Sequence, residues 1–138
     1  MASRRNFTTA VRWTLLLTVL VWLGFGLDQL LDGRLSFYYG LHPREETGLI
    51  GIGAMVFLHS GWPHLLSNTF PLVTLLGLLL FFYPRLWPRV LLTLWFGTGI
   101  LVWILARPSI HIGASGLVFA LAAFLGFSGF FAAIFGPL

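Results

Sequence analysis

Cysteine and lysine are absent from the 138-residue sequence, and charged residues make up only 9% of it. Without cysteine the chain can form no disulfide, no thiolate metal site and no thiol nucleophile. A soluble domain carries about 25% charged residues, so this chain has too few to cover a surface that faces water. Its basic residues are all arginines scattered around apolar segments, which argues against nucleic-acid binding.

Hydrophobic residues are abundant instead, at 58% of the chain. A helix needs roughly 20 mostly apolar residues to span a bilayer, and several segments meet that requirement. We therefore predict an all-α, polytopic membrane helical bundle, formed as one partial membrane domain over residues 1–138. The predicted spans are about 11–27, 64–83, 90–106 and 115–135, with an outer loop at 28–63.

The arginines predict how this bundle is oriented. Arginines precede the first span and lie between the second and third, so by the positive-inside rule the N-terminus is expected on the cytoplasmic side. All four acidic residues fall in the outer loop, which suits the other side. The arginines before the first apolar segment also resemble a signal peptide, but no small-residue cleavage site follows, so we predict an uncleaved span. The arginines used here are Arg4, Arg5, Arg12, Arg85 and Arg89.

The outer loop contains a short apolar segment, residues 49–58, that is too short to cross a bilayer. It is typical of a half-inserted or interfacial segment, and an ordinary loop lying on the membrane is the alternative. The sequence does not separate these two interpretations.

Three polar residues within or beside the spans point to chemistry, because polar groups are costly in lipid. His64 and Asn68 are four residues apart, hence on one face of the second span. Ser115 begins the fourth span, which runs in the same direction, so all three are expected at one depth. A hydroxyl with two hydrogen-bond donors suggests acyl transfer. Small-residue helix packing and hydrogen bonds between helices are the non-catalytic alternatives.

Two motifs carry a family resemblance: Phe57-Leu58-His59-Ser60-Gly61-Trp62-Pro63-His64-Leu65-Leu66-Ser67-Asn68, and later Gly113-Ala114-Ser115-Gly116. In this order they resemble the rhomboid intramembrane serine proteases, of a bacterial type. The resemblance implies Ser115 as nucleophile, with His64, Asn68 and the Ser115 backbone N–H as the oxyanion site. It implies a supporting role for His59 and a cleft lined by Gly113 and Ala114. From the residues themselves, Gly113 and Gly116 lack side chains and would let a substrate backbone approach closely.

The resemblance further implies a serine endopeptidase of the bacterial plasma (inner) membrane, with its active site toward the outer leaflet. Transmembrane protein substrates and membrane lipid are its expected partners, and no cofactor, metal or nucleic acid is expected. No histidine follows Ser115, whereas the family places its general base on a sixth span. His111 lies four residues before Ser115 and could act as the base only if the turn brought it within hydrogen-bond reach of Ser115. We expect it instead to be an interfacial loop residue.

Two explanations for the missing base remain. The chain is either part of a six-span protease, inactive by itself, or a short relative that binds transmembrane segments without cleaving them. We favour the first, because the apolar C-terminal segment has no basic residue flanking it. A small transporter or channel is a weaker third hypothesis, since ionisable residues are almost absent from the predicted spans.

Overall fold

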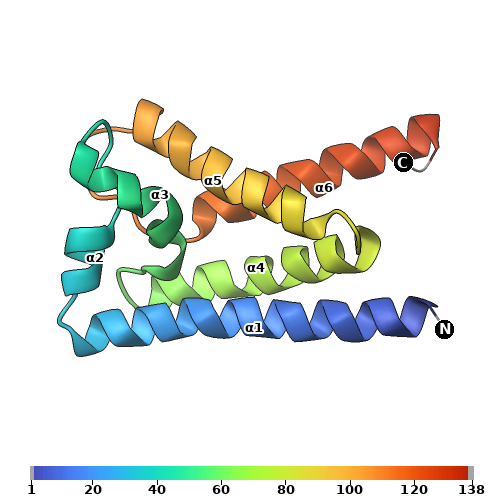
Figure 1. The fold of residues 1–138 in the computed structure, drawn as a ribbon, viewed down its shortest axis with the longest axis horizontal. Coiled ribbons are helices and arrows are strands. Elements are labelled where there is room, and N and C mark those ends of the chain that lie inside the picture. The colour runs from blue at the N-terminus through green and yellow to red at the C-terminus, as the bar shows by residue number, and fades with distance from the viewer. Residues whose placement is uncertain (1, 137–138) are drawn as a thin grey trace.

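The computed structural model describes residues 2–136 and contains four long helices (Figure 1). All four are long and apolar enough to cross a membrane. The predicted all-α membrane bundle is therefore confirmed. The four helices are α1 (Ala2–Leu30), α4 (Trp62–Phe82), α5 (Trp87–Leu105) and α6 (Ser115–Phe135).

The start of α1 differs from the predicted span. The helix begins at Ala2, earlier than residue 11, and its first turns contain arginine, asparagine and threonine. Hydropathy indicates where a helix can enter lipid, whereas backbone hydrogen bonding can continue into the water-facing region. The helix is consequently longer than its apolar part.

Short helical segments fill the loop between α1 and α4: α2 (Arg34–Tyr39), η1 (Glu46–Ile50), α3 (Gly51–Ala54) and η2 (Met55–Phe57). The apolar segment 49–58 thus forms no span. Met55, Val56 and Leu58 are buried against the bundle. Gly99 of α5 approaches so closely that an added Cβ would lie 2.5 Å from the carbonyl oxygen of Ile52. Much of this segment therefore packs on protein.

Helix α4 holds the centre of the bundle and lies alongside α1 (Figure 1). Its buried leucines follow the spacing of one helix face, and α6 packs against α4 and α5 with buried leucines of its own. This packing fixes the start of α4 relative to the start of α6. The buried leucines are Leu65, Leu72, Leu76, Leu79 and Leu80 on α4, and Leu117 and Leu121 on α6.

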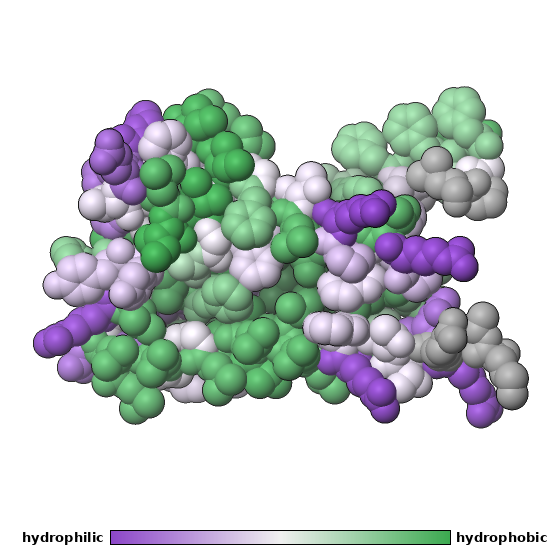
Figure 2. All heavy atoms as spheres, in the orientation of Figure 1, coloured by the Kyte–Doolittle hydropathy of each residue, from purple (hydrophilic) through white to green (hydrophobic). Residues whose placement is uncertain are grey.

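The outer surface is largely apolar, with hydrophilic side chains gathered toward the two ends of the molecule (Figure 2). A helix surface of this kind suits lipid as its solvent. The charges divide between the ends. All four acidic residues lie between the last turn of α1 and the start of η1, whereas five arginines lie in α1 or around the α4–α5 turn.

Candidate active site

Ser60, which lies just before α4, holds the ring of His64. The hydroxyl of Ser60 lies 3.1 Å from His64 Nδ1, and the Ser60 backbone N–H donates to the same atom at 3.4 Å. Because a backbone N–H can only donate, Nδ1 is the acceptor. The neutral ring therefore carries its proton on Nε2. Ser60 precedes His64 by one helical turn, so this contact is one that local spacing could have indicated.

The Nε2 edge of His64 lies against the serine motif. A Cβ added to Gly113 would sit 2.5 Å from His64 Nε2 and 2.7 Å from Cε1. Gly113 also has a φ of +115°, in a region that L side chains rarely adopt. Both the backbone and the ring therefore require glycine here. The structure thus brings together two sequence-predicted site residues that are far apart in the chain, His64 in α4 and Gly113 in the loop before α6.

Ser115 is the first residue of α6, and Ala114 is its N-cap. The Ser115 side chain is exposed, while Ala114 is completely buried. A residue at a helix N-terminus has backbone N–H groups without partners inside the helix and lies at the positive end of the helix dipole. Such a position favours negative charge developing beside the Ser115 hydroxyl.

Asn68 shares the helix face of His64 and is buried, but its amide is partly engaged. Asn68 Nδ2 donates to the backbone carbonyl of His64 at 2.9 Å. Within residues 2–136 no hydrogen bond joins Asn68 to Ser115. Only one of the two amide N–H groups therefore remains for another acceptor.

His59 lies behind His64 and is completely buried. The two rings meet edge to face, with centroids 4.9 Å apart. Neither ring nitrogen of His59 has a side-chain or backbone partner in the part of the chain that the structure describes. Burial, assisted by the proximity of His64, lowers the pKa of His59 from 6.5 to about 4, so its ring is neutral at physiological pH. A neutral ring can pack against His64 without repelling it.

The loop before Ser115 is held by the segment between α1 and α4. Leu41 and His111 exchange two backbone hydrogen bonds of 2.9 Å, and the Gly113 N–H donates to the Met55 carbonyl at 2.8 Å. The His111 ring is engaged elsewhere, with Nε2 3.0 Å from the Arg107 carbonyl. These long-range contacts fix Gly113 against His64. No local sequence pattern indicates them.

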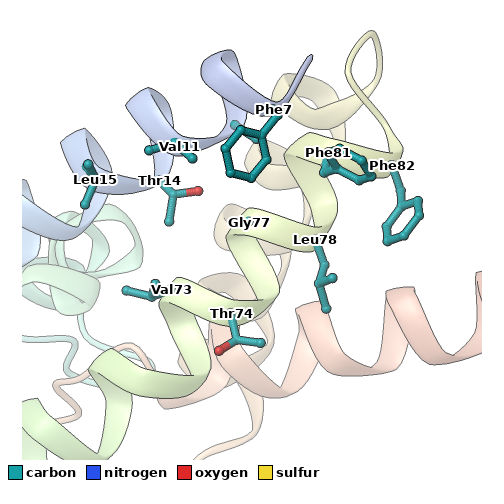
Figure 3. Close-up of a pocket in the computed structure, with 11 residues that line it drawn as sticks. Phe7, Val11, Thr14, Leu15, Val73, Thr74, Gly77, Leu78, Phe81 and Phe82 are labelled. Carbon is teal, nitrogen blue, oxygen red and sulfur yellow. The ribbon is translucent and has the colours of Figure 1, made fainter. Parts of the chain in front are cut away.

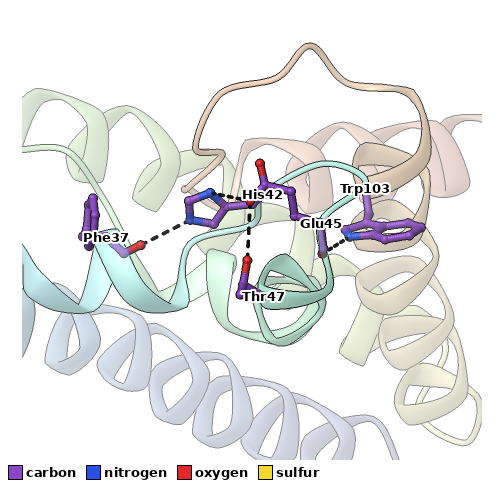
Figure 4. Close-up of polar contacts among 5 residues, drawn as sticks. All are labelled: Phe37, His42, Glu45, Thr47 and Trp103. Atoms are coloured by element: carbon purple, nitrogen blue, oxygen red, sulfur yellow. Dashed lines mark hydrogen bonds and ion pairs between the residues drawn. The ribbon is translucent and has the colours of Figure 1, made fainter.

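The same segment between α1 and α4 also contacts the end of α5 (Figure 4). The Arg44 guanidinium donates to the carbonyls of Ile104 and Ala106 at 3.1 and 2.7 Å. The indole N–H of Trp103 donates to the Glu45 carbonyl at 3.0 Å. His42, which lies on this segment, contacts the Phe37 carbonyl through Nε2 at 3.2 Å. The segment between α1 and α4 therefore forms hydrogen bonds with both the end of α5 and the loop to α6.

No group of three histidine, aspartate or glutamate side chains that could hold a metal ion occurs among the described residues. The chemical groups at the site are instead a hydroxyl at a helix N-terminus and an imidazole N–H beside the preceding glycine. Together these can supply a nucleophile and a donor for a developing oxyanion.

Comparison with known proteins gives one family. The Rhomboid domain matches residues 46–135, which include the His64 and Ser115 regions. Uncharacterized proteins of Mycobacterium bovis and Mycobacterium tuberculosis are 36% identical over 111 residues, covering 72% of this chain and 43% of each relative. An uncharacterized protein of Mycobacterium leprae is 33% identical over 92 residues, covering 62% of this chain and 37% of that relative. The chain thus spans less than half the length of these relatives. No solved structure gives a significant match.

Proposed function

The chain belongs to the rhomboid family, and we propose that its site is that of an intramembrane serine endopeptidase. One observation carries the proposal. The Nε2 edge of His64 lies against Gly113, two residues before the exposed hydroxyl of Ser115 at the start of α6. The fold thus brings a hydrogen-bond donor from a distant part of the chain against the backbone that leads to a nucleophile, an arrangement that suits acyl transfer.

In the proposed reaction, Ser115 Oγ attacks the carbonyl carbon of the scissile peptide bond and gives up its proton to a base. The carbonyl oxygen becomes negatively charged, and His64 Nε2–H and the Ser115 backbone N–H donate hydrogen bonds to it. The peptide C–N bond then breaks and the amine leaves with a proton. Water hydrolyses the resulting Ser115 ester and restores the hydroxyl. Asn68 contributes its remaining amide N–H as a third donor.

The base is the part of this mechanism that the described residues do not provide. His42 and His111 point to backbone carbonyls, and His59 is buried behind His64. None of them forms a hydrogen bond with Ser115 within residues 2–136. We propose that a histidine outside these 138 residues accepts the Ser115 proton.

The substrates that fit this site are transmembrane segments of other proteins. The start of α4 and the start of α6 lie at the end of the bundle that carries the acidic residues, away from the arginine-bearing end of α1. By the positive-inside rule the N-terminus is cytoplasmic and the site lies toward the outer leaflet, in a bacterial plasma membrane. Substrates would be cut near their outer ends.

Serine-directed labelling tests the proposal. In membranes containing the protein as its gene encodes it, a fluorophosphonate should attach to Ser115, with the site mapped by peptide mass spectrometry. His64→Ala should slow labelling by about 10²–10³-fold, as loss of an oxyanion donor does. The matched control is Ser128→Ala on the same helix, which should label as the wild type does. Labelling of Ser115 no faster than of Ser109, an exposed serine in the preceding loop, would contradict the proposal.

A second candidate function is a binder of transmembrane segments that does not cleave them. The observation in its favour is the lack of a base beside Ser115 in residues 2–136. Such a binder would retain a transmembrane peptide in detergent pull-down assays, and Ser115→Ala would bind as the wild type does. It would give no fast labelling of Ser115.

A further inference from the structure

An apolar hollow lies at the opposite end of the molecule from Ser115. It is a groove of about 510 Å³ between the first half of α1 and the second half of α4 (Figure 3). Its walls are almost wholly apolar. Phe7, Val11 and Leu15 face it from α1, and Gly77, Leu78 and Phe82 face it from α4.

The groove exists because the two helices pack differently along their length. Near the site end, Phe25 of α1 packs on Trp62 with ring centroids 4.9 Å apart, and Trp22 donates to Thr69 at 3.1 Å. At the other end Gly77 presents no side chain. A Cβ added there would have as its nearest neighbour Thr14 Oγ1, at 3.9 Å. The glycine therefore leaves an open space that a larger side chain would fill.

The water-facing mouth of the groove is basic. Arg4 lies three residues before Phe7 and seven before Val11, so it continues the α1 stripe that lines the groove. Two further arginines, Arg85 and Arg89, lie in and just after the turn that follows Phe82. All the acidic residues lie at the opposite end of the bundle, between the last turn of α1 and the start of η1. Among the described residues no arginine forms an ion pair with a carboxylate; the one carboxylate pair joins His42 to Glu45.

We propose that this groove binds an anionic phospholipid, with an acyl chain between α1 and α4 and its phosphate at Arg4. An apolar groove that opens to lipid accepts a hydrocarbon chain, and unpaired arginines at its mouth favour a negatively charged headgroup. The arginines lie beyond the last apolar turn, at the level of lipid headgroups. One lipid can therefore place its acyl chain in the groove and its phosphate beside an arginine. A phospholipid without net charge would make the same apolar contacts in the groove but would lack the electrostatic attraction to the arginines.

Native mass spectrometry of the protein as its gene encodes it, delipidated in detergent, tests this proposal. The probes are phosphatidylglycerol and phosphatidylcholine with identical acyl chains. We expect one phosphatidylglycerol to be retained, with at least tenfold preference over phosphatidylcholine. Arg4→Gln should lower that preference about fivefold, the value of one basic residue near an anionic surface. Arg107→Gln, at an exposed arginine of the other end, is the matched control and should leave the preference unchanged.

Filling the groove gives the second arm. Gly77→Leu should reduce phosphatidylglycerol retention at least tenfold, and Leu78→Trp, at a half-exposed position of the same wall, should do so if the first variant does not fold. Gly26→Leu is the matched control, since Gly26 lies on α1 with nothing within 4 Å of an added Cβ and outside this groove. Equal retention of the two lipids, or wild-type retention in the filled variants, would overturn the proposal. So would loss of a dimer on filling, which would assign the groove to a second copy.

Discussion

Gly113 is the residue on which the geometry of the candidate site depends most. Its φ of +115° lets the backbone turn before Ser115, and its missing side chain leaves room for the His64 ring. The two demands are independent, because one concerns backbone strain and the other a steric contact. Any larger residue would have to move either the loop or the histidine.

Gly113→Ala is therefore expected to damage both folding and chemistry. The strained backbone should lower the free energy of unfolding by about 1–3 kcal/mol. Displacement of His64 should slow Ser115 labelling by about 10²-fold or more. Thermal unfolding in detergent and the labelling rate measure the two effects.

Gly126→Ala is the matched control. An added Cβ meets nothing within 4 Å at Gly126, which lies within α6. There alanine should raise stability by up to about 1 kcal/mol through its helix propensity and leave labelling unchanged. Equal behaviour of the two variants would show that Gly113 has no special role.

His59 makes stability depend on pH. Its pKa is about 4 in the fold and 6.5 in an unfolded chain. Between these values the unfolded state binds a proton that the folded state does not. Stability is thus fully present above about pH 6.5 and falls as the pH drops toward 4, by up to about 1.4 kcal/mol per pH unit.

His59→Phe should flatten this dependence while keeping an aromatic ring against His64. Because neither ring nitrogen of His59 has a hydrogen-bond partner among the described residues, the change breaks no such bond. Thermal unfolding from pH 4 to 8 is the measurement. A His59→Phe slope equal to that of the wild type would refute the assignment.

Residue spacing predicted that His64, Asn68 and Ser115 form the site. The structure places His64 beside Gly113, in the motif that contains Ser115. Spacing could not predict that Asn68 already donates to the His64 carbonyl, because a shared helix face does not specify the rotamer. Nor could it predict the pairing of Leu41 with His111, which are far apart in the chain. Contacts of that range depend on how the whole bundle packs.

At the scale of elements, the segment between α1 and α4 acts as a clamp on the α5–α6 connection. Arg44 donates to two carbonyls at the end of α5, and Leu41 pairs with the loop that leads to Ser115. A helix leaves its last carbonyls without partners, so a guanidinium there stabilises its end. Hydropathy predicted the long helices, since lipid imposes their length. For residues 49–58 of this segment it did not decide between a half-inserted segment and an ordinary loop on the membrane.

Arg44→Ala is expected to loosen that clamp. The loss of two charge-assisted hydrogen bonds at an exposed position should reduce stability by about 1–2 kcal/mol. It should also slow labelling of Ser115, because the loop would be less well held. Arg107→Ala removes a neighbouring exposed arginine as the control, and unfolding temperatures in detergent compare the two. Identical unfolding temperatures would contradict the clamp.

At the scale of the whole molecule, the two ends have different tasks. The end that carries the acidic residues holds His64 and Ser115, and the end that carries Arg4, Arg85 and Arg89 holds an apolar groove (Figure 3). Because the helices connect these ends through packed leucines, Ser115 keeps a fixed position along the bundle. A fixed depth is what a protease acting on membrane-spanning substrates requires.

Cleavage of a membrane-spanning reporter tests the central claim most directly. The protein as its gene encodes it should cut the reporter when Ser115 is present, and Ser115→Ala should abolish the cut product on immunoblots. His64→Ala and Asn68→Ala should reduce cleavage by about 10²–10³-fold without abolishing it, and Ser128→Ala should have no effect. Cleavage that persists in Ser115→Ala would contradict the account.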